Sequence, residues 1–417
     1  MIQHVPVISN ELLRCELLNE ELLHEVRCAE CERCGLQNKV FRPDLEAFVV
    51  QVFEHHGAPT SEAETIARNL VRADQRGISS HGVARLGRYL AGIKAGYIRP
   101  GIEFGVQEPA PAIGVIDAKN GVGQVVSEVA MHLAIRKAKA HGVGMVTVRN
   151  SNHFGIAGYY VQMALEERML GVCMTNAAPL VIPTHGAQAV LGTNPIALGV
   201  PSARGKPILL DLATSVVPRG KLEVYDRNQK QMPVGWAVDE HGYDCQNPGA
   251  VLRNLVNRVG GGILPLGGRG EEFGGHKGFS LALLVDLLCG VLSGSAFGLD
   301  VHNLSREAED GEIVAPRVGH FFLAADISRF MPLATFEQRV DDFADMITGS
   351  RKALDQERIF MPGEKEDLRA QAHETGGIPL SDVVYESLRT IAASCGLKPP
   401  PSVAERIRPQ AEGSEIS

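Results

Sequence analysis

From residue 171 onward, several short apolar segments follow one another with only turn residues between them. Links such as Gly192-Thr-Asn-Pro195 and Ala203-Arg-Gly-Lys206 are too short to hold a crossover helix, so they favour hairpins. A sheet built in this way is antiparallel over much of its width. The predicted strands of this stretch cover residues 171–174, 189–191, 196–200 and 207–211.

Upstream of these hairpins, helical and strand patterns alternate. Strands are predicted at residues 114–117 and 142–148, and helices at 123–140 and 155–170. A later strand is predicted at 320–326. We therefore expect an α/β fold with a mixed, mostly antiparallel sheet rather than a doubly wound parallel one.

Segments outside this region have simpler patterns. Residues 248–275 are glycine-rich and are expected to form a loop. The nearly all-apolar residues 279–294 predict a helix that is buried on most sides. Residues 1–38 resemble a poorly ordered extension, and the Pro-Pro-Pro run and polar residues within 396–417 predict a disordered tail.

The composition limits the classes of partner. The net charge of −8 argues against a nucleic-acid or anionic-membrane surface as the main partner. Acidic residues interrupt the first thirty positions, and Asp286 interrupts the longest apolar run, so neither a secretory leader nor a membrane span is expected. We expect a cytoplasmic protein that binds a small molecule.

Four cysteines in the first forty residues raise the question of a metal site. Cys28, Cys31 and Cys34 have doubled C-x-x-C spacing, but only the distant Cys15 could be a fourth ligand. A closed structural zinc or iron–sulfur site needs four ligands at suitable spacing. We therefore expect no metal, and a metal-binding N-terminal module remains the alternative.

Several common catalytic motifs are missing. The chain has no G-x-G-x-x-G dinucleotide fingerprint, no phosphate-binding G-x-x-x-x-G-K-[ST] loop, no H-E-x-x-H and no G-x-S-x-G. These absences argue against the usual kinase, NTPase, zinc-protease and serine-hydrolase classes.

Two histidines lie at turns beside glycine, and both are candidates for proton transfer. His81 stands in Ser-Ser-His-Gly82, and His153 stands in Asn-Ser-Asn-His-Phe-Gly155 after a predicted strand. Imidazole titrates near neutral pH, which suits an alcohol–carbonyl interconversion. Arg85 follows His81 by four residues and could bind a carboxylate with both of its nitrogens. The alternatives are a buried structural histidine and a surface ion pair.

Three polar turns between apolar runs could serve a cofactor. They are Gly192-Thr-Asn-Pro195, Asp211-Leu-Ala-Thr-Ser215 and Gly274-Gly-His-Lys-Gly278. The last of these places a cation just before the apolar helix, where glycines let a phosphate approach the backbone. Each turn alone is a weak signal.

Taken together, eight stretches in order resemble the malate/lactate dehydrogenase family that is unrelated to the Rossmann-fold enzymes of the same names. This family also includes ureidoglycolate and sulfolactate dehydrogenases and a piperideine-2-carboxylate reductase. The resemblance covers roughly residues 40–365, and it implies a nicotinamide cofactor on a non-Rossmann sheet. The stretches are RGISSHGVARLGRY, NSNHFGIAGYY, LGTNPIALGVP, LLDLATS, GWAVDEHG, LPLGG, GGHKGFSLALLVDLLCGVLSG and HFFLAADI.

The resemblance also implies a division of the chain. Residues 39–111 would form the helical N-terminal part of a substrate domain, and residues 112–318 the cofactor-binding domain. Residues 319–395 would return to the first domain. The extension 1–38 has no counterpart in the family pattern, and the long Gly260–Gly275 loop also departs from it.

The same resemblance implies roles for individual residues. His153 corresponds to the group that exchanges a proton with the substrate, Ser80 and His81 to its catalytic neighbours, Arg85 to the carboxylate anchor and Tyr89 to a substrate-side tyrosine. Ala177 corresponds to a serine in a relative, so only a backbone contact is carried over there. The implied cofactor contacts are Ala177, Asn194, Asp211, Leu212, Ala213, Lys277, Gly278 and, more weakly, Gly363.

The sequence thus predicts an oxidoreductase that transfers hydride between NAD or NADP and a small 2-hydroxy acid or its 2-oxo acid. The resemblance implies a homodimer with active sites near the subunit interface. Two alternatives stay open, namely a reductase of a cyclic imine carboxylate and a non-catalytic binding protein on the same scaffold. Nothing in the sequence chooses between NAD and NADP or names the acid.

Overall fold

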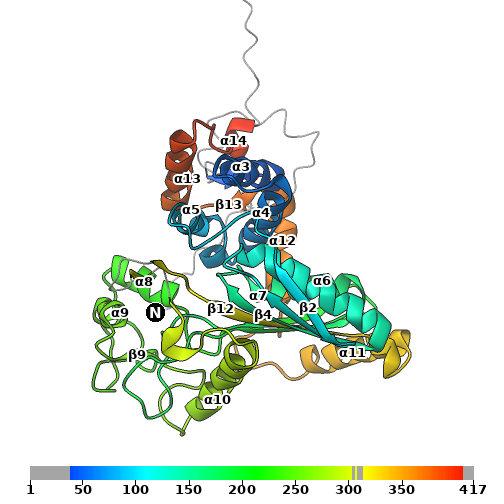
Figure 1. The fold of residues 1–417 in the computed structure, drawn as a ribbon. Helices are drawn as coiled ribbons and strands as arrows, with labels where there is room; N and C mark the ends of the chain where they lie inside the picture. Colours follow the sequence, from blue (N-terminus) through cyan, green and yellow to red (C-terminus); the bar gives the residue numbers. More distant parts are fainter. Residues whose placement is uncertain (1–37, 303–305, 308–312, 407–417) are drawn as a thin grey trace, which may run out of the picture.

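The computed structural model describes residues 38–302, 306–307 and 313–406 (Figure 1). A unit of helices lies at one end of the molecule and a large sheet with its covering helices lies below it (Figure 1). The expected N-terminal extension and its four cysteines lie outside the described residues, apart from Asn38.

The central sheet has seven strands in the order β2-β3-β4-β12-β5-β6-β7. Only β3 and β4 run parallel, and every other neighbouring pair is antiparallel. The predicted mixed, mostly antiparallel sheet is therefore confirmed. The strands are β2 (Gly105–Ala110), β3 (Ile113–Asp117), β4 (Val143–Ser151), β5 (Leu170–Thr175), β6 (Ile196–Val200), β7 (Ile208–Leu212) and β12 (Val318–Ala325).

One predicted strand is absent. Residues 189–191 make only an isolated bridge between Leu191 and Val181 and do not extend the central sheet.

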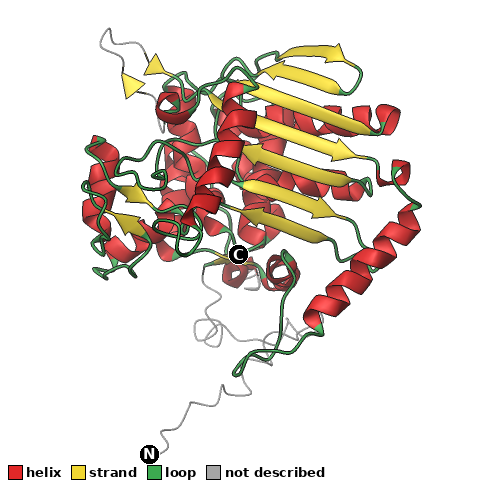
Figure 2. Cartoon of the chain, turned by 90° about the horizontal axis from the view of Figure 1, so that it is seen from below, coloured by secondary structure: helices red, strands yellow, loops and turns green. Residues whose placement is uncertain are grey.

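Helices cover both faces of this sheet (Figure 2). On one face, α6 (Gly123–His141) and α7 (Ala157–Glu166) enclose a core that includes Tyr160 and Phe322. On the other face, α10 (Gly275–Asp286) continues as the π-helix η4 (Leu287–Val291) and packs on the sheet through Val285 and Cys289. The helix α11 (Leu333–Thr348) follows β12.

The apolar helix predicted at 279–294 forms, but it is not buried on most sides. Leu281, Leu284, Leu287 and Val291 are 37%, 41%, 47% and 52% exposed in the single chain. Its sequence is apolar all round, and the sheet covers only one side of it.

The helical unit combines both ends of the described chain. Its core joins α3 (Arg42–His55) and α4 (Thr60–Gln75) to α13 (Asp382–Ser394), and β1 (Lys39–Val40) pairs with β13 (Ile378–Pro379). The remaining helices of this unit are α5 (Leu86–Lys94), α12 (Glu364–Gly376) and α14 (Val403–Arg406).

Two expected boundaries need correction. Strand β12 lies in the middle of the central sheet, so the return to the helical unit does not begin at residue 319. Residues 396–406 were expected to be disordered, yet Pro400 accepts a hydrogen bond from Tyr385 at 3.1 Å and Arg406 pairs with Asp44. These two contacts fix the segment against the helical unit.

A small lobe contains α8 (Arg219–Arg227), α9 (Pro248–Asn257) and the pair β8 (Ala237–Val238) and β9 (Gly262–Ile263). The loop predicted over 248–275 is wrong in its first part, because Asn247 caps α9 by accepting the N–H of Ala250 at 3.1 Å. Among the described residues, no helix is long and apolar enough to cross a membrane.

Candidate active site

The first wall of the site is the turn between α4 and α5. It consists of two short 3-10 helices, η2 (Ser79–His81) and η3 (Val83–Arg85), joined by Gly82. Any side chain at Gly82 would collide with the carboxyl group of the buried Asp74, whose Oδ2 accepts the N–H of Val83 at 2.7 Å. Burial raises the pKa of Asp74 to about 7.

Within this turn the predicted substrate-side residues contact one another. Nε of Arg85 donates to the carbonyl oxygen of Ser80 at 2.6 Å, and Oγ of Ser80 lies 2.9 Å from Nδ1 of His81. The turn therefore orients an imidazole and a guanidinium together.

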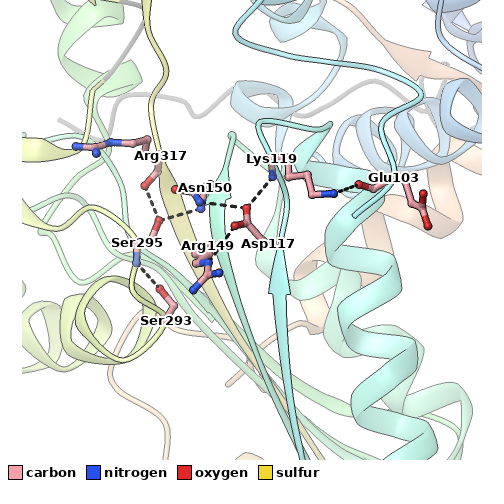
Figure 3. A network of polar contacts seen from close by, with 8 residues as sticks. All are labelled: Glu103, Asp117, Lys119, Arg149, Asn150, Ser293, Ser295 and Arg317. Atoms are coloured by element: carbon pink, nitrogen blue, oxygen red, sulfur yellow. Dashed lines mark hydrogen bonds and ion pairs between the residues drawn. The ribbon is translucent and has the colours of Figure 1, made fainter. Parts of the chain in front are cut away.

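The second wall is the exit of β4, which leads to His153. Asn150, near the end of β4, has a left-handed backbone with φ of 53°, at the register shift just before Ser151 pairs with Val318 of β12. Figure 3 shows how this residue is held: the N–H of Asn150 donates to Ser295 Oγ at 3.2 Å and its Nδ2 donates to Asp117 Oδ1 at 3.1 Å. Arg149 donates to the other oxygen of Asp117 at 3.2 Å. This network fixes the start of the segment that ends in His153.

The two walls meet at the histidines. The rings of His81 and His153 stack with their centroids 5.5 Å apart. The hydroxyl of Tyr89 lies 2.6 Å from Nδ1 of His153. The structure thus brings Ser80, His81, Arg85, Tyr89 and His153 together.

Burial and positive charge keep both imidazoles neutral. Burial, with Arg85 and Arg88 nearby, lowers the pKa of His81 to about 4. His153 retains some exposed surface, but protein surrounds its ring, and this burial, together with Arg88, His81, Arg85 and His320, lowers its pKa well below the usual value. Burial also raises the pKa of Tyr89 to about 12, so the phenol keeps its proton.

His320, in β12, lies next to this cluster and packs against Phe154. It is fully buried, with Nδ1 2.8 Å from Oγ1 of Thr175 and Nε2 2.8 Å from Oγ of Ser151, and it stacks on Phe154. Both of its ring nitrogens have partners, so we assign it a structural role.

On the cofactor side, Asn194 is buried and its amide is fully used within the protein. Its Oδ1 accepts the N–H of Ala177 at 3.1 Å, and its Nδ2 donates to the carbonyl oxygen of Ala282 and to Oδ2 of Asp286 at 2.9 and 3.0 Å. Asn194 therefore ties two loops to α10, and its side chain is not free for a cofactor.

Asp286 is the centre of this network, and it was not among the predicted site residues. Besides Asn194, it accepts a hydrogen bond from Nδ2 of the buried Asn176 at 3.0 Å. A lone acid inside an apolar helical run was the available signal, since buried acids need partners.

The other predicted cofactor residues divide into two groups. Oδ2 of Asp211 accepts the N–H of Gly158 at 2.8 Å; the residue is exposed in the single chain, but protein surrounds its carboxyl group, and this burial raises its pKa to about 6. Leu212 and Ala213 follow it at the end of β7, and Gly363 packs against Leu209 of the same strand.

Lys277 and Gly278 lie in the first turn of α10. Gly278 packs on the backbone of Leu266, so it serves close packing of the preceding loop. Within the described part of the chain Lys277 is exposed and makes no ion pair, and Gly274 before it has φ of 88°. An unpaired cation at a helix N-terminus fits the phosphates of a dinucleotide.

Comparison with known proteins finds relatives over most of this chain. A malate dehydrogenase of Pyrococcus abyssi is 45% identical over 360 residues, which are 86% of this chain and 96% of that protein. The crystal structure of malate dehydrogenase from Entamoeba histolytica superposes with a TM-score of 0.82 at 34% identity, covering 87% of this chain and 99% of that one. A Delta(1)-pyrroline-2-carboxylate/Delta(1)-piperideine-2-carboxylate reductase of Pseudomonas syringae pv. tomato is 30% identical over 350 residues, 84% of this chain and 95% of that protein.

A family model described as malate/L-lactate dehydrogenase matches residues 41–389, which include both walls of the site and the whole central sheet. The chain belongs to the malate/L-lactate dehydrogenase family.

Proposed function

We propose that this protein is an NAD(P)-dependent dehydrogenase that interconverts a small 2-hydroxy acid and its 2-oxo acid. The observation that carries the proposal is the contact between Tyr89 and His153 beside His81 and the arginine-bearing turn. These groups can bind an acid and exchange a proton with its C2 oxygen.

The charges favour a substrate with two acidic groups. Arg85 and Arg219 both lie close enough to Arg88 to lower its pKa by repulsion, in addition to the effect of burial. Arg219 also pairs with Glu223 at 2.8 Å, so Arg85 and Arg88 are the two guanidinium groups that an anion of more than one charge would stabilise. Malate and sulfolactate have this character, whereas lactate has a single carboxylate.

His153 is the proposed proton carrier, with Ser80 and His81 beside it. Arg85 and Arg88 help to hold its pKa down, and a bound dianion would offset their charge. Substrate binding is therefore expected to relieve part of the depression of the His153 pKa, while the neutral ring exchanges its proton with the substrate oxygen.

A bound nicotinamide ring would give or accept the hydride at the substrate C2. Lys277 and the backbone around Gly274 are the proposed phosphate contacts, and Ala177, with the end of β7 at Asp211, Leu212 and Ala213, the proposed dinucleotide contacts. Asn194 would act by holding its loop, and Gly363 by packing beside β7.

The proposal is tested with malate, sulfolactate, lactate, ureidoglycolate and piperideine-2-carboxylate, each with NAD(H) and NADP(H). We expect the highest kcat/KM for a dianionic 2-hydroxy acid. A preference for the cyclic imine would support the reductase alternative, which the relative from Pseudomonas syringae favours. A lack of turnover with every pair, despite cofactor binding, would support a non-catalytic role.

We also propose a homodimer that works in the cytoplasm and binds neither nucleic acid nor membrane. The exposed leucines of α10 and η4 offer an apolar face to a second copy, near the cofactor-side loops tied to α10. The four cysteines among the described residues are free thiols, which suits a reducing compartment. Light scattering tests the dimer, and a monomer at micromolar concentration would contradict it.

A further inference from the structure

Gln124, the second residue of α6, has an unusual environment. It is completely buried, and neither Oε1 nor Nε2 has a hydrogen-bond partner among the described residues. Leaving such a group unpaired costs about 1–3 kcal/mol. Buried groups of this kind persist where function needs them.

The surroundings of Gln124 belong to the site. Gly123 packs against the carbonyl oxygens of Asn152 and His153, so the first turn of α6 forms the wall behind the histidine. The Gln124 amide lies close enough to the phenol of Tyr89 to favour its ionised form, although neither amide atom reaches hydrogen-bond geometry.

The phenol in turn decides which nitrogen of His153 carries the proton. Tyr89 keeps its proton and lies 2.6 Å from Nδ1, and the N–H of Gly155 also points to Nδ1 at 3.3 Å. Two donors at Nδ1 make it the acceptor, so the ring proton lies on Nε2.

We propose that Gln124 is a positioning residue for the proton transfer: in the substrate complex its Nε2 donates to the Tyr89 oxygen, and this fixes the phenol as donor to Nδ1 of His153. The inference rests on the proposed function and assigns that site a further residue. A donor to the phenol strengthens the phenol's own hydrogen bond, because bonds in a chain polarise one another.

The proton transfers through His153 and Tyr89 also balance the reaction. In the direction of reduction, C2 receives the hydride and its oxygen takes the proton from Nε2, while Nδ1 takes the phenolic proton of Tyr89. Burial disfavours a free phenolate and raises the pKa of Tyr89 to about 12, while Arg88, Arg85 and Gln124 partly offset this, so the phenol must regain a proton from water as it gives one up. The imidazolium, which burial and the facing charges of Arg85, Arg88, His81 and His320 disfavour, is never required.

The decisive variant is Gln124→Met, which keeps the length of the side chain and removes both unpaired atoms. We expect its Tm to equal or exceed that of the wild type, because no buried polar group is left unpaired. Cofactor affinity and KM should change little, whereas kcat should fall about 10–100-fold. Gln124→Glu, which cannot donate when ionised, should show a similar loss that is relieved at lower pH.

Ser127→Ala is the matched control. Oγ of Ser127 is also buried on α6 without a partner, one turn further along. This variant should gain as much stability as Gln124→Met and keep its kcat.

The tautomer of His153, measured by NMR, tests the role of Gln124 independently of the enzyme's activity. The protein is labelled with ¹⁵N-histidine, and the His153 signals are assigned by their loss in His153→Ala. With bound malate or sulfolactate, the wild type should show the Nε2–H tautomer of His153. Gln124→Met should show a mixture of the two tautomers. An unchanged kcat together with an unchanged tautomer overturns the inference and leaves the proposed function intact. If the wild type turns over none of the acids, the proposed function fails, and an unchanged tautomer then still overturns the role of Gln124.

Discussion

Tyr89 and His153 are 64 positions apart in the chain, and the phenol oxygen lies 2.6 Å from Nδ1 of the imidazole. Tyr89 belongs to α5 of the helical unit, and His153 follows β4 of the central sheet. The proposed proton-transfer pair therefore exists only where these two parts of the molecule meet.

Replacing Tyr89 by Phe removes one hydroxyl and keeps the ring. We expect kcat to fall about 10–100-fold, because His153 loses the donor that fixes its tautomer. Cofactor affinity should be unaffected, as measured by the fluorescence of NADH or NADPH. A kcat within twofold of the wild type would show that the phenol plays no part in the proton transfer.

Replacing Arg85 by Lys keeps the charge and loses the planar contact with a carboxylate. The expected effect is a rise in KM for the acid of roughly tenfold or more, corresponding to about 1.5–3 kcal/mol for a charged hydrogen bond. Steady-state kinetics measure it. Arg351→Ala, at an exposed position after α11, is the control and should leave KM unchanged. If Arg85→Lys and Arg351→Ala had the same KM for the acid, Arg85 would not be the carboxylate anchor.

Replacing Asp286 by Asn should weaken cofactor binding more than it affects the acid. Its new amide would face the Nδ2 donors of Asn176 and Asn194 at 3.0 Å, which sets donors against each other in a buried network. Titration with NADH should show a higher Kd. Asp74→Asn, beneath the substrate-side turn, should show the reverse pattern, with a higher KM for the acid and an unchanged Kd. If both variants changed the Kd for NADH and the KM for the acid in the same way, Asp286 would not act on the cofactor side and Asp74 on the substrate side.

The contribution of His320 to stability should fall on acidification. Burial lowers the pKa of His320 to about 3 in the folded chain, below its ordinary value of 6.5. The unfolded chain thus binds the proton at this residue first, so the contribution of His320 is fully present above pH 6.5 and is lost as the pH falls toward 3, while the raised pKa values of Asp74 and Asp211 act in the opposite direction. The slope from this histidine is at most about 1.4 kcal/mol per pH unit. Urea denaturation at several pH values measures it, and His320→Gln should flatten the curve; an equal slope in this variant would contradict the assignment.

A charge on the exposed face of α10 tests the dimer. Leu284 is 41% exposed there, and Leu284→Arg should dissociate the dimer because an arginine would be buried without a partner. Leu354→Arg is the control, since Leu354 is 93% exposed in the segment after α11. Light scattering should give a monomer only for Leu284→Arg, and a dimer in both variants would place the interface elsewhere.

Much of the fold could be predicted because its signals are local. Apolar runs with turn residues between them located β5, β6 and β7 within one or two residues. The cap formed by Asn247 was overlooked among the nearby glycines, and the helix it starts was taken for a loop. The exposure of α10 could not be predicted, because periodicity says nothing about how much of an apolar helix its neighbours cover.

In the site, residue types beside glycine turns and the resemblance pointed to His81, Arg85 and His153. Their contacts depend on packing between segments that are distant in the chain, and so do the pKa values of these histidines. Gln124 and Asp286 gave weaker signals, because a glutamine or an acid in a helix is usually solvated.

Local chemistry along the chain was enough to specify the mixed sheet and the residues able to move a proton or hold an anion, since hydrogen-bonding capacity and charge belong to each side chain. Only the folded structure decided which groups stay neutral, which amides are already used and which face of α10 stays open. Those properties arise from desolvation and from contacts across long sequence separations, and neither is encoded in any single segment.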